Sequence, residues 1–208
     1  MSKLLHISAS PRGDRSESLA LGETFLTTYR DANPGAEIDA WDLWDGSLPH
    51  FGPAAAHAKM TIFGGGTPTG DQAAAWDAAR DAFQRFDAYD RYLFTVPMWN
   101  SGVPYILKQF IDVVSQPGMA FSFDPVTGYT GLLTGKKAAV IYTGAVYGEG
   151  RGRAFGTDHQ QPFLHDWLEW AGISDIAEVA FRPNLVTADA AAGRDLARAA
   201  VTDLAKRF

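Results

Sequence analysis

Strand-like and helix-like stretches take turns along most of this chain, and this alternation limits the folds that are open to it. Five short apolar runs have the length and residue types of strands: residues 3–8, 37–43, 91–97, 137–142 and 176–181. Five longer stretches carry apolar residues at helical spacing: residues 16–31, 71–87, 105–114, 162–171 and 188–208. A helical crossover allows successive strands to lie parallel. We therefore predict an α/β fold, a doubly wound five-stranded parallel sheet with helices on both faces.

The remaining segments are predicted from their residue types. Residues 37–43 alternate apolar and polar side chains, which favours a strand near the edge of the sheet. The glycine-rich residues 64–70 are interpreted as a flexible connection, with an active-site rim as the alternative. Residues 115–136 are expected to form a long loop. Trp41 and Trp44 belong either to the core or to an interface.

Composition excludes several classes of protein. The chain has 208 residues, 46% of them hydrophobic, and we expect one domain spanning residues 1–208. A net charge of −6, spread along the sequence, argues against nucleic acid as a partner. Because there is no cysteine, any redox chemistry requires a cofactor. No apolar stretch approaches the roughly 20 residues of a membrane-spanning helix, and we expect a soluble, cytoplasmic protein without a signal peptide.

Three loops that follow predicted strands are rich in ligand-binding groups. Ligands of open parallel sheets bind at the carboxyl ends of the strands, near the point where the strand order reverses. We name these segments the serine loop (residues 9–18), the second loop (residues 97–104, PMWNSGVP) and the third loop (residues 143–152, TGAVYGEGRG).

The serine loop has the composition of a phosphate site. Ser10, Ser16 and Ser18 surround the predicted start of a helix, where hydroxyl groups, backbone N–H groups and the helix dipole stabilise an anion. The patterns of dinucleotide-binding and Walker loops are absent. The alternative is that Ser16 is only a helix N-cap and the other serines are turn residues.

The second loop suits a planar heterocycle. Met98, Trp99 and Asn100 offer a soft contact, a large flat face and an amide. Ser101 and Gly102 then allow the backbone to approach a ligand closely. Core packing is the alternative interpretation of Trp99, but two such loops meeting at one pocket favour a ligand site.

Three passages resemble one enzyme family: SASPRGDRSES, VPMWNSGVPYILKQFID and GMAFSFDPVTGYTGLLTGKKAAVIYTGAVYG. They are similar, in consistent order, to the FMN-dependent NADH:quinone oxidoreductases, also called FMN-dependent NADH-azoreductases. The resemblance implies a flavodoxin-like fold and bound FMN. It also implies a homodimer that transfers two electrons from NADH or NADPH to quinones and aromatic azo compounds by a ping-pong mechanism.

The resemblance assigns roles to particular residues. Those that match the FMN phosphate and ribityl site are Ser10, Ser16, Glu17 and Ser18. Those that match the loops along the isoalloxazine ring are Met98, Trp99, Asn100, Ser101, Thr143, Gly144, Ala145 and Val146. Aromatic residues that match the space over the flavin, in part across a homodimer interface, are Phe121 and Trp170. No catalytic acid or base is implied.

This chain also departs from the family pattern. Trp99 replaces a more common tyrosine, Ser101 stands where phenylalanine is frequent, and TGAV in the third loop offers only Gly144 where two glycines are usual. We expect these differences to reshape the ring end of the pocket.

Two other functions and a metal site are alternatives to this interpretation. A flavodoxin-like electron carrier or an NAD(P)H:FMN reductase would have a similar phosphate loop. The scattered acidic residues favour the enzyme over a carrier that docks to proteins. Four residues lie close in sequence but match no zinc signature, so we expect no metal: His159, His165, Asp166 and Glu169.

Overall fold

The fold is taken from a computed structural model that describes residues 2–208. Within these residues, five parallel strands form the main sheet in the order β2-β1-β3-β6-β7. The strands are β1 (Lys3–Ser8), β2 (Glu37–Asp42), β3 (Arg91–Pro97), β6 (Lys137–Thr143) and β7 (Asp175–Phe181). The strand order reverses between β1 and β3, and β2 lies at an edge as predicted.

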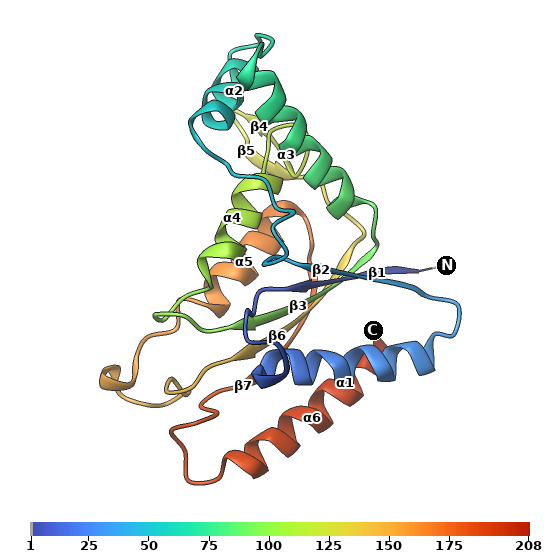
Figure 1. The fold of residues 1–208 in the computed structure, drawn as a ribbon, viewed down its shortest axis with the longest axis vertical. Coiled ribbons are helices and arrows are strands. Elements are labelled where there is room, and N and C mark those ends of the chain that lie inside the picture. Colours follow the sequence, from blue (N-terminus) through green and yellow to red (C-terminus); the bar gives the residue numbers. More distant parts are fainter. Residues whose placement is uncertain (1) are drawn as a thin grey trace.

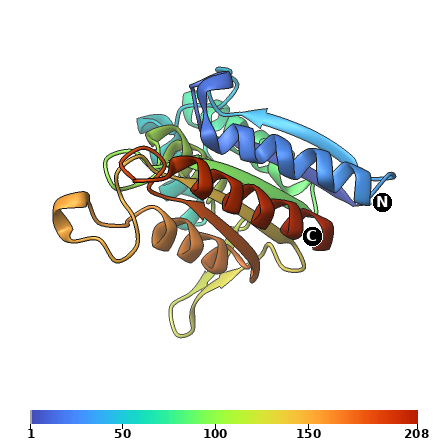
Figure 2. The ribbon, with the colours of Figure 1, turned by 90° about the horizontal axis from the view of Figure 1, so that it is seen from below.

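Helices cover both faces of the sheet. Figures 1 and 2 show α1 (Glu17–Ala32) and α6 (Ala190–Arg207) side by side on one face. The other face is covered by α3 (Asp71–Asp87), α4 (Tyr105–Val114) and α5 (Gln161–Ala171). The predicted flavodoxin-like, doubly wound α/β fold is therefore confirmed.

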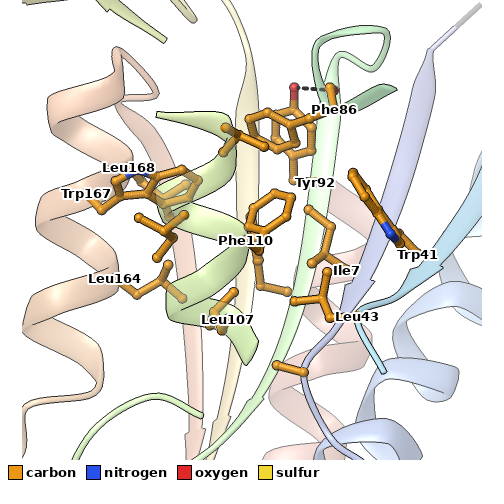
Figure 3. Close-up of a cluster of buried hydrophobic side chains, with 14 of the residues drawn as sticks. Ile7, Trp41, Leu43, Phe86, Tyr92, Leu107, Phe110, Leu164, Trp167 and Leu168 are labelled. Atoms are coloured by element: carbon orange, nitrogen blue, oxygen red, sulfur yellow. Dashed lines mark hydrogen bonds between the residues drawn. The ribbon is translucent and has the colours of Figure 1, made fainter. Parts of the chain in front are cut away.

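The two faces of the sheet have separate cores. Leu4 of β1 packs toward α1 and α6, whereas Leu5 and Ile7 pack toward the other helices. Central strands are buried on both faces, so their sequences read as continuous apolar runs. Figure 3 shows the larger core, in which the Phe110 ring of α4 lies 5.3 Å from Phe86 and 5.5 Å from Trp41, measured between ring centroids.

A buried histidine lies on the face of the sheet that α1 covers. His6 of β1 is buried, and its Nε2 lies 3.0 Å from the Thr95 hydroxyl oxygen of β3. Helix α1 approaches this pair at Gly22, where a Cβ atom would come within 2.7 Å of the Thr95 methyl group. Burial lowers the pKa of His6 from 6.5 to about 4, so the ring is neutral at pH 7.

One prediction about the connecting segments is wrong, and one helix was missed. Residues expected to form a long loop contain a hairpin of β4 (Phe121–Asp124) and β5 (Gly128–Gly131). Each strand has only four residues, which are too few to show a clear alternation of apolar and polar side chains. A further helix, α2 (Pro53–Phe63), was missed because it buries only Ala55 and Ala58 and so has no apolar stripe.

Residues 64–70 connect α2 to α3, and these two helices lie with the β4–β5 hairpin at one end of the molecule (Figure 1). Among residues 2–208, no helix combines the length and the apolar composition needed to cross a membrane.

Candidate functional site

A cavity of about 110 Å³ lies at the carboxyl ends of β1, β3, β6 and β7, beside the point where the strand order reverses. All three predicted loops contribute to it. Its lining consists of Ser10, Arg12, Ser16, Glu17, Pro97, Met98, Trp99, Thr143, Gly144, Ala145 and Asn184. This is the position in which open α/β sheets bind ligands.

The serine loop enters α1 through a helix cap. Ser16 is the N-cap, and its Oγ accepts a hydrogen bond of 3.3 Å from the backbone N–H of Leu19. Ser18 is fully buried, with its Oγ 3.1 Å from that of Ser16, and it does not line the cavity. Ser16 is therefore a helix N-cap, the alternative to a phosphate ligand that the sequence left open, and it also lines the cavity. The N–H groups of Glu17 and Ser18, in the first turn, have no acceptor within the helix.

Ser10 carries the clearest sign of a ligand-binding role. Its Oγ is buried in the cavity wall and has no hydrogen-bond partner. Burying a hydroxyl group in this way costs about 1–3 kcal/mol, and buried polar groups in native proteins are nearly always satisfied. An anion at the N-terminus of α1 would supply an acceptor for this group and for the free N–H groups. The residues present therefore fit a phosphate group.

The cavity lining contains one positively and one negatively charged side chain, Arg12 and Glu17. Arg12 lines the cavity, whereas the Glu17 carboxylate accepts two hydrogen bonds from Arg194 of α6, at 2.9 and 2.5 Å. These hydrogen bonds, with the nearby positive charges, lower the pKa of Glu17 below its ordinary value. The carboxylate is therefore ionised and held by Arg194. Of the polar groups of Glu17, only the backbone N–H remains available to a ligand.

The second loop forms a tight turn. The backbone N–H groups of Trp99 and Gly102 each donate to the other residue's carbonyl at 2.9 Å. Between them, Asn100 and Ser101 both have positive φ angles, 48° and 70°. Such angles are uncommon outside glycine and cluster at ligand-binding loops. Neither residue is part of the cavity lining, and their predicted contact with a ring stays a prediction.

A second tryptophan supports Trp99. The ring centroids of Trp44 and Trp99 lie 5.7 Å apart, and Trp44 Nε1 donates a hydrogen bond of 3.1 Å to the carbonyl oxygen of Ala9. Trp41, in contrast, is buried in the core. The two tryptophans left open by the sequence thus have different roles.

The third loop is clamped to the segment after β7. Asn184 N–H donates to the Gly144 carbonyl at 2.9 Å, and Val186 N–H donates to that of Ala145 at 3.0 Å. A Cβ atom on Gly144 would lie 3.3 Å from the Arg182 Cγ and 3.4 Å from the Met98 Cβ, so the third loop packs closely against both side chains here. Val146, a predicted ring contact, is exposed and lies outside the cavity lining.

Buried polar contacts join three strand ends behind the cavity. Arg182, just after β7, donates to Asp158 at 2.9 Å, and both side chains are largely buried. Gln160 is fully buried and donates from Nε2 to the carbonyl of Val96 in β3, also at 2.9 Å. The loop after β6 is therefore fixed to both β3 and β7.

Phe121 and Trp170 do not reach this cavity within one chain. Their ring centroids lie 4.8 Å apart, and both line a second cavity of about 190 Å³ together with Lys59 and Tyr129. Their place over a flavin, across a dimer interface, stays a prediction.

Sequence reasoning also missed residues that line the cavity. Asn184 follows the last strand of the sheet, and the rule that selected the other three loops would have selected it too. Arg12 lies in the serine loop itself. Arg194 gave no signal, because it lies 177 residues from its partner on a helix rich in charged residues. Among residues 2–208, no three histidine, aspartate or glutamate side chains gather in a way that could hold a metal ion.

A doubly wound sheet with a cavity at its reversal point whose lining fits a phosphate group is typical of flavodoxin-like proteins. A family model of the flavodoxin-like fold matches residues 2–204. The chain is 45% identical to an FMN-dependent NADH:quinone oxidoreductase of Ruegeria pomeroyi over 97% of this chain and 99% of that protein. It is 40% identical to one of Desulfotalea psychrophila, over 89% and 87%. The chain belongs to this family of FMN-dependent NADH:quinone oxidoreductases.

Solved structures share the fold. An azoreductase from Bacillus anthracis superposes with a TM-score of 0.91, at 23% identity and with both chains covered completely. A second, described as an FMN-dependent NADH-azoreductase in complex with FMN, gives a TM-score of 0.88 at 23% identity, covering 100% of this chain and 99% of that one.

Proposed function

We propose that this chain binds FMN in the cavity at the end of β1 and transfers two electrons from NADH or NADPH to quinones. The single observation that carries the proposal is the buried, unpartnered Ser10 Oγ beside the free N–H groups of α1. In this assignment, Ser10 and the N-terminus of α1 bind the phosphate. Met98 and Trp99 form a wall for the ring, and Gly144 leaves room for it.

The chemistry that FMN supplies when bound is hydride acceptance and two-electron transfer, which no side chain of this cysteine-free chain provides. The protein binds and orients the group and limits access of water to it. The cavity lining holds no histidine, and its one carboxylate is already held by Arg194. We therefore assign no acid or base to the reaction, and solvent can protonate a reduced quinone.

Spectroscopy and steady-state kinetics test this proposal together. We expect the full-length protein to bind FMN with a defined stoichiometry and to oxidise NADH when benzoquinone is present. If the donor and the acceptor use one site in turn, double-reciprocal plots over a matrix of both concentrations give parallel lines. Intersecting lines would contradict the shared site. FMN binding with negligible NADH oxidation would favour the electron carrier.

Aromatic azo compounds are proposed as further acceptors, and methyl red is a suitable probe. They are flat, as quinones are, and the structural relatives with this fold are azoreductases. A protein that reduces benzoquinone but not methyl red would restrict the activity to quinones.

A homodimer is proposed because Phe121 and Trp170 lie away from the cavity in their own chain. Mixing two defective variants tests this directly. Ser10→Arg fills one subunit's phosphate site, and Phe121→Ala removes the aromatic ring that would serve the partner. If the ring acts across the interface, the mixed dimer has one intact site, and its activity exceeds the sum of the parents. A fully active monomer in ultracentrifugation would refute the dimer.

A further inference from the structure

Arg194 holds the only carboxylate in the cavity lining of residues 2–208. Its Nε and Nη2 atoms reach the two oxygens of Glu17, at 2.9 and 2.5 Å. The guanidinium lies 5.7 Å from the centre of the Phe181 ring at the end of β7, which limits its movement. A two-point contact between planar groups fixes orientation as well as charge. The first residue of α1 is thereby tied to the second turn of α6.

This contact solves an electrostatic problem at the phosphate site. Glu17 is the first residue of α1 and lines the cavity, so its N–H group has no acceptor within the helix, but its side chain carries the same sign of charge as a phosphate. Like charges at short range repel by several times the thermal energy when partly shielded from water. An unpaired Glu17 carboxylate would therefore oppose the binding that the helix N-terminus favours.

We propose that Arg194 is a positioning residue for a phosphate monoester, acting through Glu17. It neutralises the carboxylate and holds it toward α6, so that the N-terminus of α1 and Ser10 face the phosphate without a competing negative charge. The inference rests on the proposed FMN site. It makes Arg194 a determinant of the preference for FMN over riboflavin, which has the same ring and no phosphate.

Arg194→Gln tests the proposal by flavin binding alone. Dissociation constants for FMN and riboflavin are measured by fluorescence titration of the flavin-free full-length chain at low salt. We expect the FMN dissociation constant to rise about tenfold, because the Glu17 carboxylate would lie uncompensated near the phosphate dianion. The riboflavin dissociation constant should stay unchanged. Arg198→Gln is the matched control, because it removes the same charge one turn later from an exposed pair with Asp195. It should change the ratio of the two constants much less.

The double variant Glu17→Gln/Arg194→Gln separates charge compensation from a structural role. Removing both charges should return the FMN constant close to that of the wild type, while Glu17→Gln alone should not weaken FMN binding. If Arg194→Gln fails to fold, Arg194→Lys is the substitute, because it keeps the charge with a single contact. Its FMN dissociation constant should exceed that of the wild type, but by less than the roughly tenfold rise expected for loss of the charge.

Two results would overturn the inference. One is equal weakening of FMN and riboflavin binding in Arg194→Gln, and the other is a double variant as weak as Arg194→Gln. Both differ from failure of the proposed function, in which the wild-type chain itself would not bind FMN.

Discussion

Trp44 connects two of the loops that form the cavity. Its ring centroid lies 5.7 Å from that of Trp99 in the second loop, and its Nε1 donates to the Ala9 carbonyl in the serine loop. Tyr105, at the start of α4, meets both indoles, with its ring centroid 5.2 Å from Trp44 and 6.2 Å from Trp99. The relative position of the phosphate end and the ring end of the cavity therefore depends on one side chain from outside all three loops.

Two substitutions at Trp44 separate its contacts. Trp44→Phe removes the hydrogen bond to Ala9 but keeps an aromatic neighbour for Trp99, so we expect FMN to bind about two to five times more weakly, the loss of part of a neutral hydrogen bond. Trp44→Ala removes both contacts and should cost about tenfold or more, since aromatic pairs add about 0.5–1.5 kcal/mol. Fluorescence titration measures both. Equal affinities of the two variants would show that the Trp99 contact has no role.

Ser10→Ala and Ser16→Ala should have opposite effects on the flavin-free protein. Ser10 Oγ is buried without a partner, so its removal should leave the free energy of unfolding unchanged or raise it. Ser16 caps α1, and its removal should cost about 1 kcal/mol. Urea unfolding of the flavin-free chains measures this difference.

The same Ser10→Ala variant should bind FMN about tenfold more weakly, since a hydrogen bond to a charged group contributes about 1.5–3 kcal/mol. Unchanged FMN affinity would exclude Ser10 from the phosphate site. Riboflavin affinity serves as the internal control, because that ligand carries no phosphate.

The sequence predicted the central part of this fold well because the buried strands are short apolar runs. Residues 71–87 and 91–97 were delimited without error, since the helix has an apolar stripe and the strand ends at a proline. The β4–β5 hairpin and α2 were missed for a shared reason. Both belong to a peripheral unit that packs by aromatic pairs and small side chains, such as Ala55 and Ala58, and gives no periodic apolar signal.

The candidate site was predictable in position but not in side-chain roles. The carboxyl-end rule located the three loops, yet it could not show that the Ser18 hydroxyl lies against that of Ser16 or that Asn100 is not part of the cavity lining. The sequence around Arg194 also gives no sign of its contact with Glu17, because contacts between distant helices depend on tertiary packing. Resemblance to a family transfers positions, whereas the direction of each side chain must come from the structure.

His6 should make stability depend on pH below 7. Its pKa is about 4 in the folded chain and 6.5 when exposed, so the unfolded chain binds the proton more tightly. The stabilisation is fully present above pH 6.5 and is lost as the pH falls toward 4, by up to about 3 kcal/mol. His6→Gln keeps a group that can bond to Thr95 but does not titrate. Urea unfolding at pH 7.5 and pH 5 should show a smaller loss for the variant, and equal losses would contradict the buried neutral histidine.

Breaking the ion pair behind the cavity should destabilise the chain strongly. Arg182→Gln leaves the Asp158 carboxylate buried without its partner, which typically costs about 3–5 kcal/mol. Asp158→Asn in the same chain should recover part of that loss. Arg80→Gln is the control, since its pair with Asp77 is exposed and should contribute under about 1 kcal/mol. Thermal unfolding measures all three, and a loss at Arg182 no larger than at Arg80 would contradict the role of this pair.

The cavity wall runs from Ser10 to Asn184, so its parts come together only when nearly the whole chain has folded. A ligand of this cavity binds the native state and has no site on the unfolded chain. At a hundred times its dissociation constant, such a ligand raises the free energy of unfolding by about 2.7 kcal/mol, which lowers the unfolded population about a hundredfold. Proteases that cut the unfolded chain would then remove the empty protein far faster than the loaded one. The supply of cofactor would thus set how long each molecule survives as well as how many are active.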